Sequence, residues 1–145
     1  SPSVDPSESP SVSLCSNLLQ EFGSSIKLTN LDLFKEENGI AITTIPGDIG
    51  CLTDLTMINF GYNDFTGSIP NEIGLLTGLT NLNLWGNEFS DTIPSEIGLL
   101  TSLTKLSLNG NDFTGTFPSE IGLLTSLTRL SLRYNDFTGT IPNEI

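Results

Sequence analysis

The chain has 145 residues, with five Lys or Arg, seventeen Asp or Glu and no His, and its formal net charge is −12. This length suits one domain that can bury a core. The charge disfavours binding to nucleic acids and to anionic membranes, because both depend on Lys and Arg. Without His, the chain has no Ser-His-Asp or Cys-His catalytic set and lacks the commonest zinc ligand. No apolar run reaches the roughly 18 residues of a membrane-spanning helix, so no membrane insertion is expected within these residues.

Two segments of different character come first. Residues 1–13 are rich in Ser and Pro and carry two acids, which predicts a disordered or extended linker. Residues 14–27 are expected to form a short capping helix, because apolar residues recur at helical spacing between Ser13 as N-cap and Gly23 as a stop. The apolar residues of this helix are Leu14, Leu18, Leu19 and Phe22.

A unit of 24 residues then repeats along the chain. Four copies fill residues 52–145, and the last one is truncated by two residues. Residues 28–51 are a weaker copy with an irregular middle, and we expect them to form a degenerate capping repeat, because the end repeats of a stack are atypical. The four regular copies begin at Leu52, Leu76, Leu100 and Leu124.

Each unit contains an alternating L-x-L element. The alternation predicts a short strand whose two apolar residues face inward. Repetition every 24 residues then stacks the strands as a parallel sheet, at a spacing of about 4.8 Å per repeat. The inward pairs are Ile58 and Phe60, Leu82 and Leu84, Leu106 and Leu108, and Leu130 and Leu132.

An Asn and a Phe follow each predicted strand. The Asn is expected to turn inward and to hydrogen-bond the backbone where the chain leaves the sheet, and the Phe to join an aromatic stack in the core. A Gly then permits a bend, except that the second unit has Asp91 there, and the Ile-Pro and Ile-Gly pairs suit a short 3-10 turn on the outer side. The residues concerned are Asn63, Asn87, Asn111 and Asn135, Phe65, Phe89, Phe113 and Phe137, and Gly67, Gly115 and Gly139.

The unit reads L-x-x-L-x-x-L-x-L-x-x-N-x-F-x-G-x-I-P-x-x-I-G-x, with FTGSIP, FTGTFP and FTGTIP as its clearest segments. In this the chain resembles the plant-type 24-residue class of the leucine-rich repeat superfamily, over roughly Leu28 to Ile145. The resemblance implies an α/β-type repeat solenoid, a right-handed coil with a concave parallel β-sheet and 3-10 turns on its convex side. Receptor-kinase ectodomains, polygalacturonase-inhibiting proteins and similar arrays in diatoms share this style. Their common role implies recognition of a protein, peptide or glycan, and an extracellular or cell-surface location.

The resemblance also implies a binding face, because the family binds ligands through outward-facing residues of the concave strands. The matching positions form four columns, which hold all three cations of the four regular repeats, the only Trp and both Tyr. Trp, Tyr and Arg are favoured interface anchors. We therefore predict a ligand-binding face made of Met57, Asn59, Tyr62, Asn81, Asn83, Trp85, Lys105, Asn109, Arg129, Arg133 and Tyr134. Gly61, Gly86, Gly110, Ser107 and Ser131 complete the columns.

The leading hypothesis is a non-catalytic recognition module that needs no cofactor. The alternative is a structural or adhesive surface-associated array without a discrete ligand. An enzyme is disfavoured because the repeated Asp, Glu, Ser and Thr occupy equivalent environments, whereas a catalytic acid and base need different ones.

Two repeated surface patterns leave less favoured functions open. The acid columns could bind Ca²⁺, but each rung supplies one carboxylate and no D-x-D-x-D-G loop occurs, so a solvated surface is preferred. The T-x-T columns resemble those of ice-binding proteins. The acids are Asp64, Glu88, Asp112 and Asp136, and Glu72, Glu96, Glu120 and Glu144. The hydroxyl columns are Thr66, Ser90, Thr114 and Thr138, and Ser68, Thr92, Thr116 and Thr140.

Cys51 stands where later repeats have Leu75, Leu99 and Leu123. One interpretation is a buried free Cys that acts as a small apolar residue. The other is a disulfide with Cys15 of the capping helix, which would contribute about 3–4 kcal/mol.

The last repeat stops at Ile145 without a polar cap. We expect these residues to belong to a longer protein and the isolated chain to associate through this apolar end, because natural repeat arrays cover it.

Overall fold

A computed structural model of the chain describes residues 29–32 and 43–140. The predicted linker at 1–13, the capping helix at 14–27 and Glu144 lie outside the described residues, and the boundaries of these segments stay predictions.

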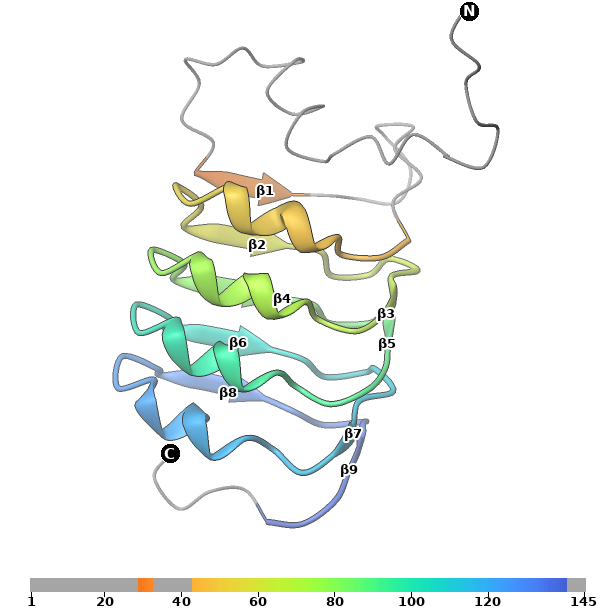
Figure 1. Ribbon diagram of the computed structural model, residues 1–145. Helices are drawn as coiled ribbons and strands as arrows, with labels where there is room; N and C mark the ends of the chain where they lie inside the picture. The colour runs from red at the N-terminus through yellow and green to blue at the C-terminus, as the bar shows by residue number, and fades with distance from the viewer. Residues whose placement is uncertain (1–28, 33–42, 141–145) are drawn as a thin grey trace, which may run out of the picture.

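Five short strands form one parallel sheet, in which each strand lies beside the strand of the next repeat (Figure 1). The register places equivalent positions side by side, so that Met57 faces Asn81, which faces Lys105. Ile58, Leu82 and Leu106, the central residues of their strands, are buried, which confirms the predicted alternation. The strands are β1 (Asn30–Asp32), β2 (Met57–Asn59), β4 (Asn81–Asn83), β6 (Lys105–Ser107) and β8 (Arg129–Ser131).

A second layer consists of short 3-10 helices, as the Ile-Pro and Ile-Gly pairs predict. Each helix follows a Pro with extended backbone angles, such as Pro70 at φ −70° and ψ 148°, because the proline ring fixes φ near this value. Consecutive helices stack on one another, and Figure 1 shows them in front of the sheet. They are η1 (Gly47–Cys51), η2 (Asn71–Leu75), η3 (Ser95–Leu99) and η4 (Ser119–Leu123).

Two further pairs of two-residue strands run along one edge of the coil, and the sequence pattern did not predict them (Figure 1). They form because the chain is extended around each Phe of the core, so neighbouring repeats form backbone hydrogen bonds such as Glu88 N–H to Phe65 O at 2.8 Å. The first pair is β3 (Thr66–Gly67) with β5 (Glu88–Phe89), and the second is β7 (Thr114–Gly115) with β9 (Asp136–Phe137).

The core between these layers contains the predicted aromatic stack. Successive ring centroids lie 5.8, 6.0 and 6.1 Å apart, and the rings are within 7° of parallel. Phe89 and Phe113 are fully buried, whereas Phe137 at the end of the stack is half-buried. The stack consists of Phe65, Phe89, Phe113 and Phe137.

The Asn residues after the strands turn inward, as predicted, and join neighbouring repeats. Asn87 is 8% exposed, and its Nδ2 donates to Phe60 O of the previous repeat at 2.8 Å and to Leu84 O of its own repeat at 3.0 Å. Its Oδ1 accepts the Phe65 N–H at 3.0 Å. One amide therefore satisfies backbone groups that the end of each strand would otherwise leave unpaired in the core.

Cys51 does not occupy a buried position, so the interpretation as a buried free Cys is wrong. It is exposed at the end of η1 and is disulfide-bonded. Leu75, Leu99 and Leu123 are likewise more than half exposed, because the side chain at the last position of each helix points outward. The predicted partner Cys15 lies outside the described residues, and its pairing with Cys51 stays a prediction.

The helices stack closely enough that only glycine fits at one position in each of η1, η2 and η3, namely Gly50, Gly74 and Gly98. A Cβ added to Gly98 in η3 would lie 2.7 Å from both Glu120 O and Glu120 Cβ. Gly98→Ala should therefore lower the free energy of unfolding by about 1–3 kcal/mol in a urea titration, since backbone must move. Gly78→Ala is the matched control, because the nearest atom to its added Cβ is Leu55 O at 3.7 Å. Equal losses in the two variants would contradict the close packing of the helices.

Candidate ligand-binding face

The outward-facing side of the five-stranded sheet, together with the turn after each strand, is called the sheet face below. All eleven residues predicted from the sequence lie on it. β6 places Lys105 beside Arg129 of β8, and β2 places Met57 beside Asn81 of β4. β1 extends the first two columns by Asn30 and Asp32, which the sequence pattern alone did not assign to this face.

Part of the sheet face is occupied by hydrogen bonds within the protein. Asn83 Nδ2 donates to Asn59 Oδ1 at 2.7 Å, and Asn59 Nδ2 donates to Asp32 Oδ1 at 3.0 Å. Ser107 Oγ lies 2.7 Å from Asn109 Oδ1, to which it donates. These side chains orient one another, so they form a polar floor rather than a set of unoccupied groups.

The aromatic residues of the sheet face stand above this floor. Tyr62 and Trp85 make an edge-to-face pair with ring centroids 4.5 Å apart and planes at 88°. Both remain accessible, with 69% of Tyr62 and 40% of Trp85 exposed. This geometry fixes two large side chains before any ligand arrives, which lowers the entropic cost of binding.

Tyr62 and Tyr134 occupy backbone conformations that favour glycine. Both have a φ of 58°, and the equivalent positions of the middle repeats are Gly86 and Gly110, with φ of 70° and 66°. A Cβ in this left-handed region costs roughly 1–2 kcal/mol. The two end repeats therefore present a tyrosine at a position where glycine is less strained, and such strain tends to persist at functional sites.

The strain at Tyr134 predicts an order of stability among its variants. Tyr134→Gly should be about 1 kcal/mol more stable than Tyr134→Ala, because only glycine adopts this φ without a penalty. At Arg133, where φ is negative, the order should reverse, and Arg133→Ala should be the more stable variant. Thermal unfolding of the four proteins checks both orders, and the same order at both positions would contradict the assigned strain.

The cations of the described residues all lie on the sheet face. Lys105, Arg129 and Arg133 are exposed, and none forms an ion pair with another described residue. Lys105, Arg129 and Trp85 line a shallow hollow of about 310 Å³, and Ser107 and Asn83 contribute to its polar lining.

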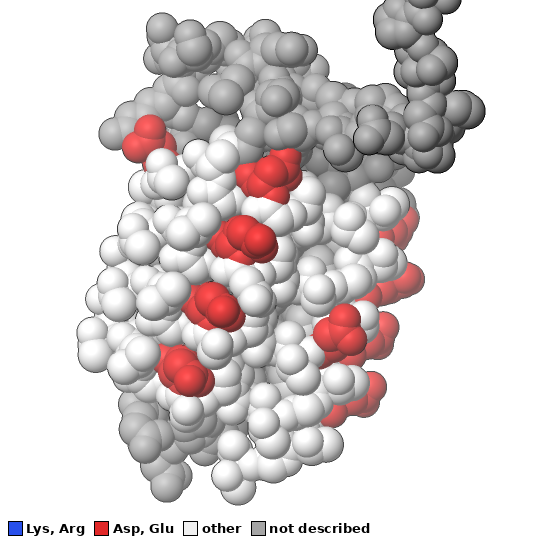
Figure 2. Space-filling model, in the orientation of Figure 1, with Lys and Arg blue, Asp and Glu red and all other residues white. Residues whose placement is uncertain are grey.

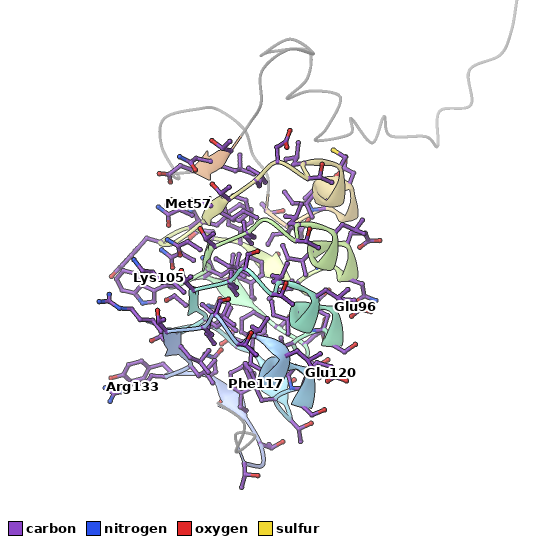
Figure 3. The ribbon with its side chains drawn as sticks, turned by 90° about the vertical axis from the view of Figure 1, so that its left-hand side faces the viewer. Met57, Glu96, Lys105, Phe117, Glu120 and Arg133 are labelled. Carbon is purple, nitrogen blue, oxygen red and sulfur yellow. The ribbon has the colours of Figure 1, made fainter. Side chains whose placement is uncertain are left out.

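Apart from Asp32, the acids of the described repeats lie on other faces of the coil, as the sequence predicted. Figure 2 shows two acidic columns, one over the 3-10 helices and one along the edge formed by β3, β5, β7 and β9. Figure 3 shows Met57, Lys105 and Arg133 on one side of the coil and Glu96 and Glu120 on the other. No group of three or more acids, Cys or His that could hold a metal ion occurs in residues 29–32 and 43–140.

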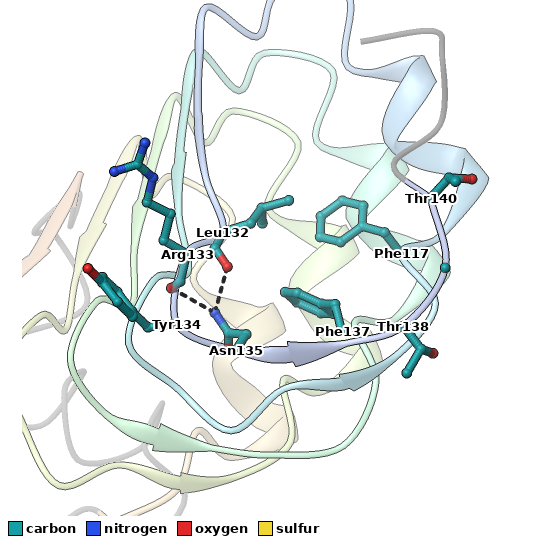
Figure 4. A pocket seen from close by; sticks show the side chains of 9 residues that line it. Phe117, Leu132, Arg133, Tyr134, Asn135, Phe137, Thr138 and Thr140 are labelled. Carbon is teal, nitrogen blue, oxygen red and sulfur yellow. Dashed lines mark hydrogen bonds between the residues drawn. The ribbon is translucent and has the colours of Figure 1, made fainter.

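A second hollow of about 280 Å³ lies at the end of the stack (Figure 4). Phe117 and Phe137 pack edge to face there, with ring planes at 77° and centroids 5.4 Å apart, while Arg133 and Tyr134 point away from them. Asn135 closes the turn through its Nδ2, which donates to Leu132 O at 3.1 Å. The expected association through this end stays a prediction.

One repeated hydroxyl column was missed by the sequence reading. In each repeat a Thr just before the strand donates its hydroxyl to the equivalent carbonyl of the previous repeat, as Thr80 Oγ1 does to Thr56 O at 2.9 Å. The signal was present, because Thr recurs at this position in all four regular units. The donors are Thr56, Thr80, Thr104 and Thr128.

Comparisons with known proteins agree with this geometry. The structure is similar to the BIR3–SERK2 complex from Arabidopsis thaliana, with 38% identity, a TM-score of 0.67 and coverage of 70% of this chain and 55% of that chain. It is similar to the plant peptide hormone receptor RGFR1 in complex with RGF2, with 39% identity, a TM-score of 0.69 and coverage of 70% of this chain and 16% of that chain. A plant ice-binding protein matches with 31% identity, a TM-score of 0.65 and coverage of 70% and 33%.

The chain spans about half or less of the length of these solved structures. No curated protein sequence matches it significantly. No helix within the described residues is long and apolar enough to cross a membrane. The family model described as Leucine Rich Repeat matches residues 54–76, 78–100, 102–124 and 126–145, and these four matches cover more than half of the chain. The chain belongs to the leucine-rich repeat family.

Proposed function

We propose that the chain is a non-catalytic recognition module, at an extracellular or cell-surface location, that binds a protein or peptide on its sheet face. The observation that carries the proposal is the separation of scaffold and variable residues. The third and fourth repeats differ at five aligned positions, and three of these, at Lys105 and Arg129, Asn109 and Arg133, and Gly110 and Tyr134, lie on the sheet face.

The architecture supports recognition in a second way. The strands, the row of inward-facing Asn residues (the Asn ladder) and the Phe stack hold the scaffold rigid. The side chains above it therefore lose little conformational entropy when a ligand binds. Trp, Tyr and Arg carry much of the binding energy at protein interfaces, and Trp85, Tyr134 and Arg133 stand there exposed. Among the structural neighbours are receptor complexes with a peptide hormone and with a second receptor protein, which also supports the proposal.

Selection from a random-peptide library displayed on phage tests the proposal. Peptides enriched on the wild-type chain should bind the Trp85→Ala/Tyr134→Ala variant at least tenfold more weakly, because both anchors are lost. The matched control is Leu99→Ala/Leu123→Ala, which removes two large exposed side chains from the helix side. Enriched peptides that lose affinity only in the control would place binding on the helix side and contradict the proposal.

The runner-up is a structural or adhesive array without a discrete ligand. It differs from a recognition module in that its sheet face is not expected to select particular peptides or proteins. No enrichment of any peptide or displayed protein over the input library would favour it.

A second candidate function, binding to an ice surface, has support from the outer hydroxyl columns and from the plant ice-binding neighbour. Ser68, Thr92, Thr116 and Thr140 are all exposed, and Thr44 continues their column. A Cβ on Gly115 would lie 2.7 Å from the Thr92 methyl group, so the glycine leaves room for that methyl. The charged side chain of Asp91 interrupts the surface, which is why this candidate ranks below the recognition module and the structural array.

Inhibition of ice recrystallisation tests the second candidate. If the outer columns bind ice, the wild-type chain inhibits recrystallisation, Thr116→Tyr abolishes the effect, and Asn81→Tyr on the sheet face leaves it unchanged. Absence of inhibition by the wild-type chain would refute ice binding without affecting the recognition proposal.

A further inference from the structure

We infer that the ligand of the sheet face is a peptide with an acidic segment, whose carboxylates lie on Lys105, Arg129 and Arg133. This inference rests on the proposed recognition function and names the chemical class of its partner.

The first support is the placement of the cations. Residues 43–140 contain only these three Lys and Arg, and they fall on the last two strands of the sheet and the turn that follows. Lys105 and Arg129 are neighbours in register, at the strand spacing of about 4.8 Å. Like charges directly opposite each other destabilise a sheet, and an anionic ligand removes that repulsion. Within the described residues no carboxylate of the chain does so.

The second support is the hollow beside them. Its volume of about 310 Å³ is at the small end of ligand sites and suits one or two side chains rather than a large molecule. Lys105 and Arg129 line it together with Trp85, and the Ser107 hydroxyl is directed to Asn109 rather than into it. An acidic side chain next to an apolar one would meet a cation and an aromatic ring at once.

The strongly negative net charge does not exclude such a ligand. The acids over the 3-10 helices, such as Glu96 and Glu120, lie on the far side of the coil (Figure 3), beyond a layer separation of about 10 Å. This exceeds the Debye length of about 8 Å at physiological ionic strength, so solvent ions screen most of their repulsion. Lys105 and Arg133 therefore lie nearer to a ligand on the sheet face than Glu96 and Glu120 do.

The pattern along the sheet favours a peptide over an anionic polysaccharide. The first column changes from Met57 and Asn81 to Lys105 and Arg129, and Asp32 stands at the opposite end of the second column. A uniformly charged polymer would place carboxylates over Met57 and Asp32, where nothing compensates them. A peptide can confine its acids to one end and set apolar or neutral residues over Met57 and the Tyr62–Trp85 pair.

The test uses the whole chain and peptides selected from the random library. We expect the enriched pool to contain at least twice the Asp and Glu content of the input library. Synthetic peptides from the pool should bind the Lys105→Gln/Arg129→Gln/Arg133→Gln variant at least tenfold more weakly, and their affinity for the wild type should fall as salt rises. The matched control, Ser68→Glu/Thr92→Glu/Thr116→Glu, lowers the net charge by the same amount on the outer side and should change affinity less than twofold. Circular dichroism verifies that both variants fold.

Three results would overturn the inference. A pool without acid enrichment that depends on Trp85 and Tyr134 would refute the acidic class and leave the recognition function standing. Tighter binding of polygalacturonate than of any selected peptide would assign the face to an anionic glycan instead. Failure of every peptide to bind would refute both the inference and the proposed function.

Discussion

Replacing Asn111 by Leu will lower the free energy of unfolding by about 3–5 kcal/mol. Asn111 is 7% exposed, and its Nδ2 donates to Leu84 O and Leu108 O, both at 3.0 Å, while its Oδ1 accepts the Phe89 N–H at 3.1 Å. Leu has the same number and branching of side-chain heavy atoms, so the variant leaves no large cavity but leaves three buried backbone groups without this partner, at about 1–3 kcal/mol each before relaxation.

The matched control for Asn111→Leu is Asn81→Leu. Asn81 lies half-buried on the sheet face and makes no side-chain hydrogen bond to another described residue. Its replacement should change stability by less than about 0.5 kcal/mol in the same urea titration. A comparable loss in both variants would mean that the Asn ladder does not hold the repeats together.

Truncation of the aromatic stack will have an effect of similar size. Phe113 is fully buried between Phe89 and Phe137, and Phe113→Ala should cost about 3–5 kcal/mol, because the cavity lies in the middle of a rigid stack. Phe137→Ala makes the same chemical change at the half-buried end of the stack and should cost less than half as much. Equal unfolding midpoints for the two variants would contradict a core centred on the inner repeats.

Much of this fold could be predicted from the sequence, because the repeated copies show several times which residue type each position requires. The Asn after the strand and the Phe two residues later keep their spacing in every regular copy, so their environments must be equivalent in a stack. The same argument predicts the register of the sheet, in which Lys105 lies beside Arg129. The irregular middle of the weaker copy, from Lys35 to Ile40, breaks the spacing, so Asp32 was not assigned to the sheet face.

The error at Cys51 has a different cause. The last residue of each helix and the residue after it are both apolar, such as Leu75 and Leu76, and only the second is buried. Hydrophobicity alone does not show which of two neighbours points inward, since that depends on where the 3-10 helix ends. One of the two interpretations of Cys51 therefore treated it as buried, whereas the equivalent Leu75 is exposed.

The sequence predicted which residues face outward at the candidate site, but not how their side chains interact. Asn59 and Asn83 were grouped with Lys105 and Trp85 because all four face outward. The structure distinguishes them, because Asn59 and Asn83 hydrogen-bond each other, and Asn83, Trp85 and Lys105 line the hollow whereas Asn59 does not. The strained φ of Tyr62 and Tyr134 likewise becomes apparent only from backbone geometry.

The fluorescence of Trp85 gives the most direct test of recognition by the sheet face, because this is the only Trp in the chain. A selected peptide should change its emission saturably, with the same midpoint as binding measured through a label on the peptide, since the ligand covers the exposed indole. Binding that saturates without any change in Trp85 emission, and that persists in Trp85→Ala/Tyr134→Ala, would show that the ligand binds elsewhere.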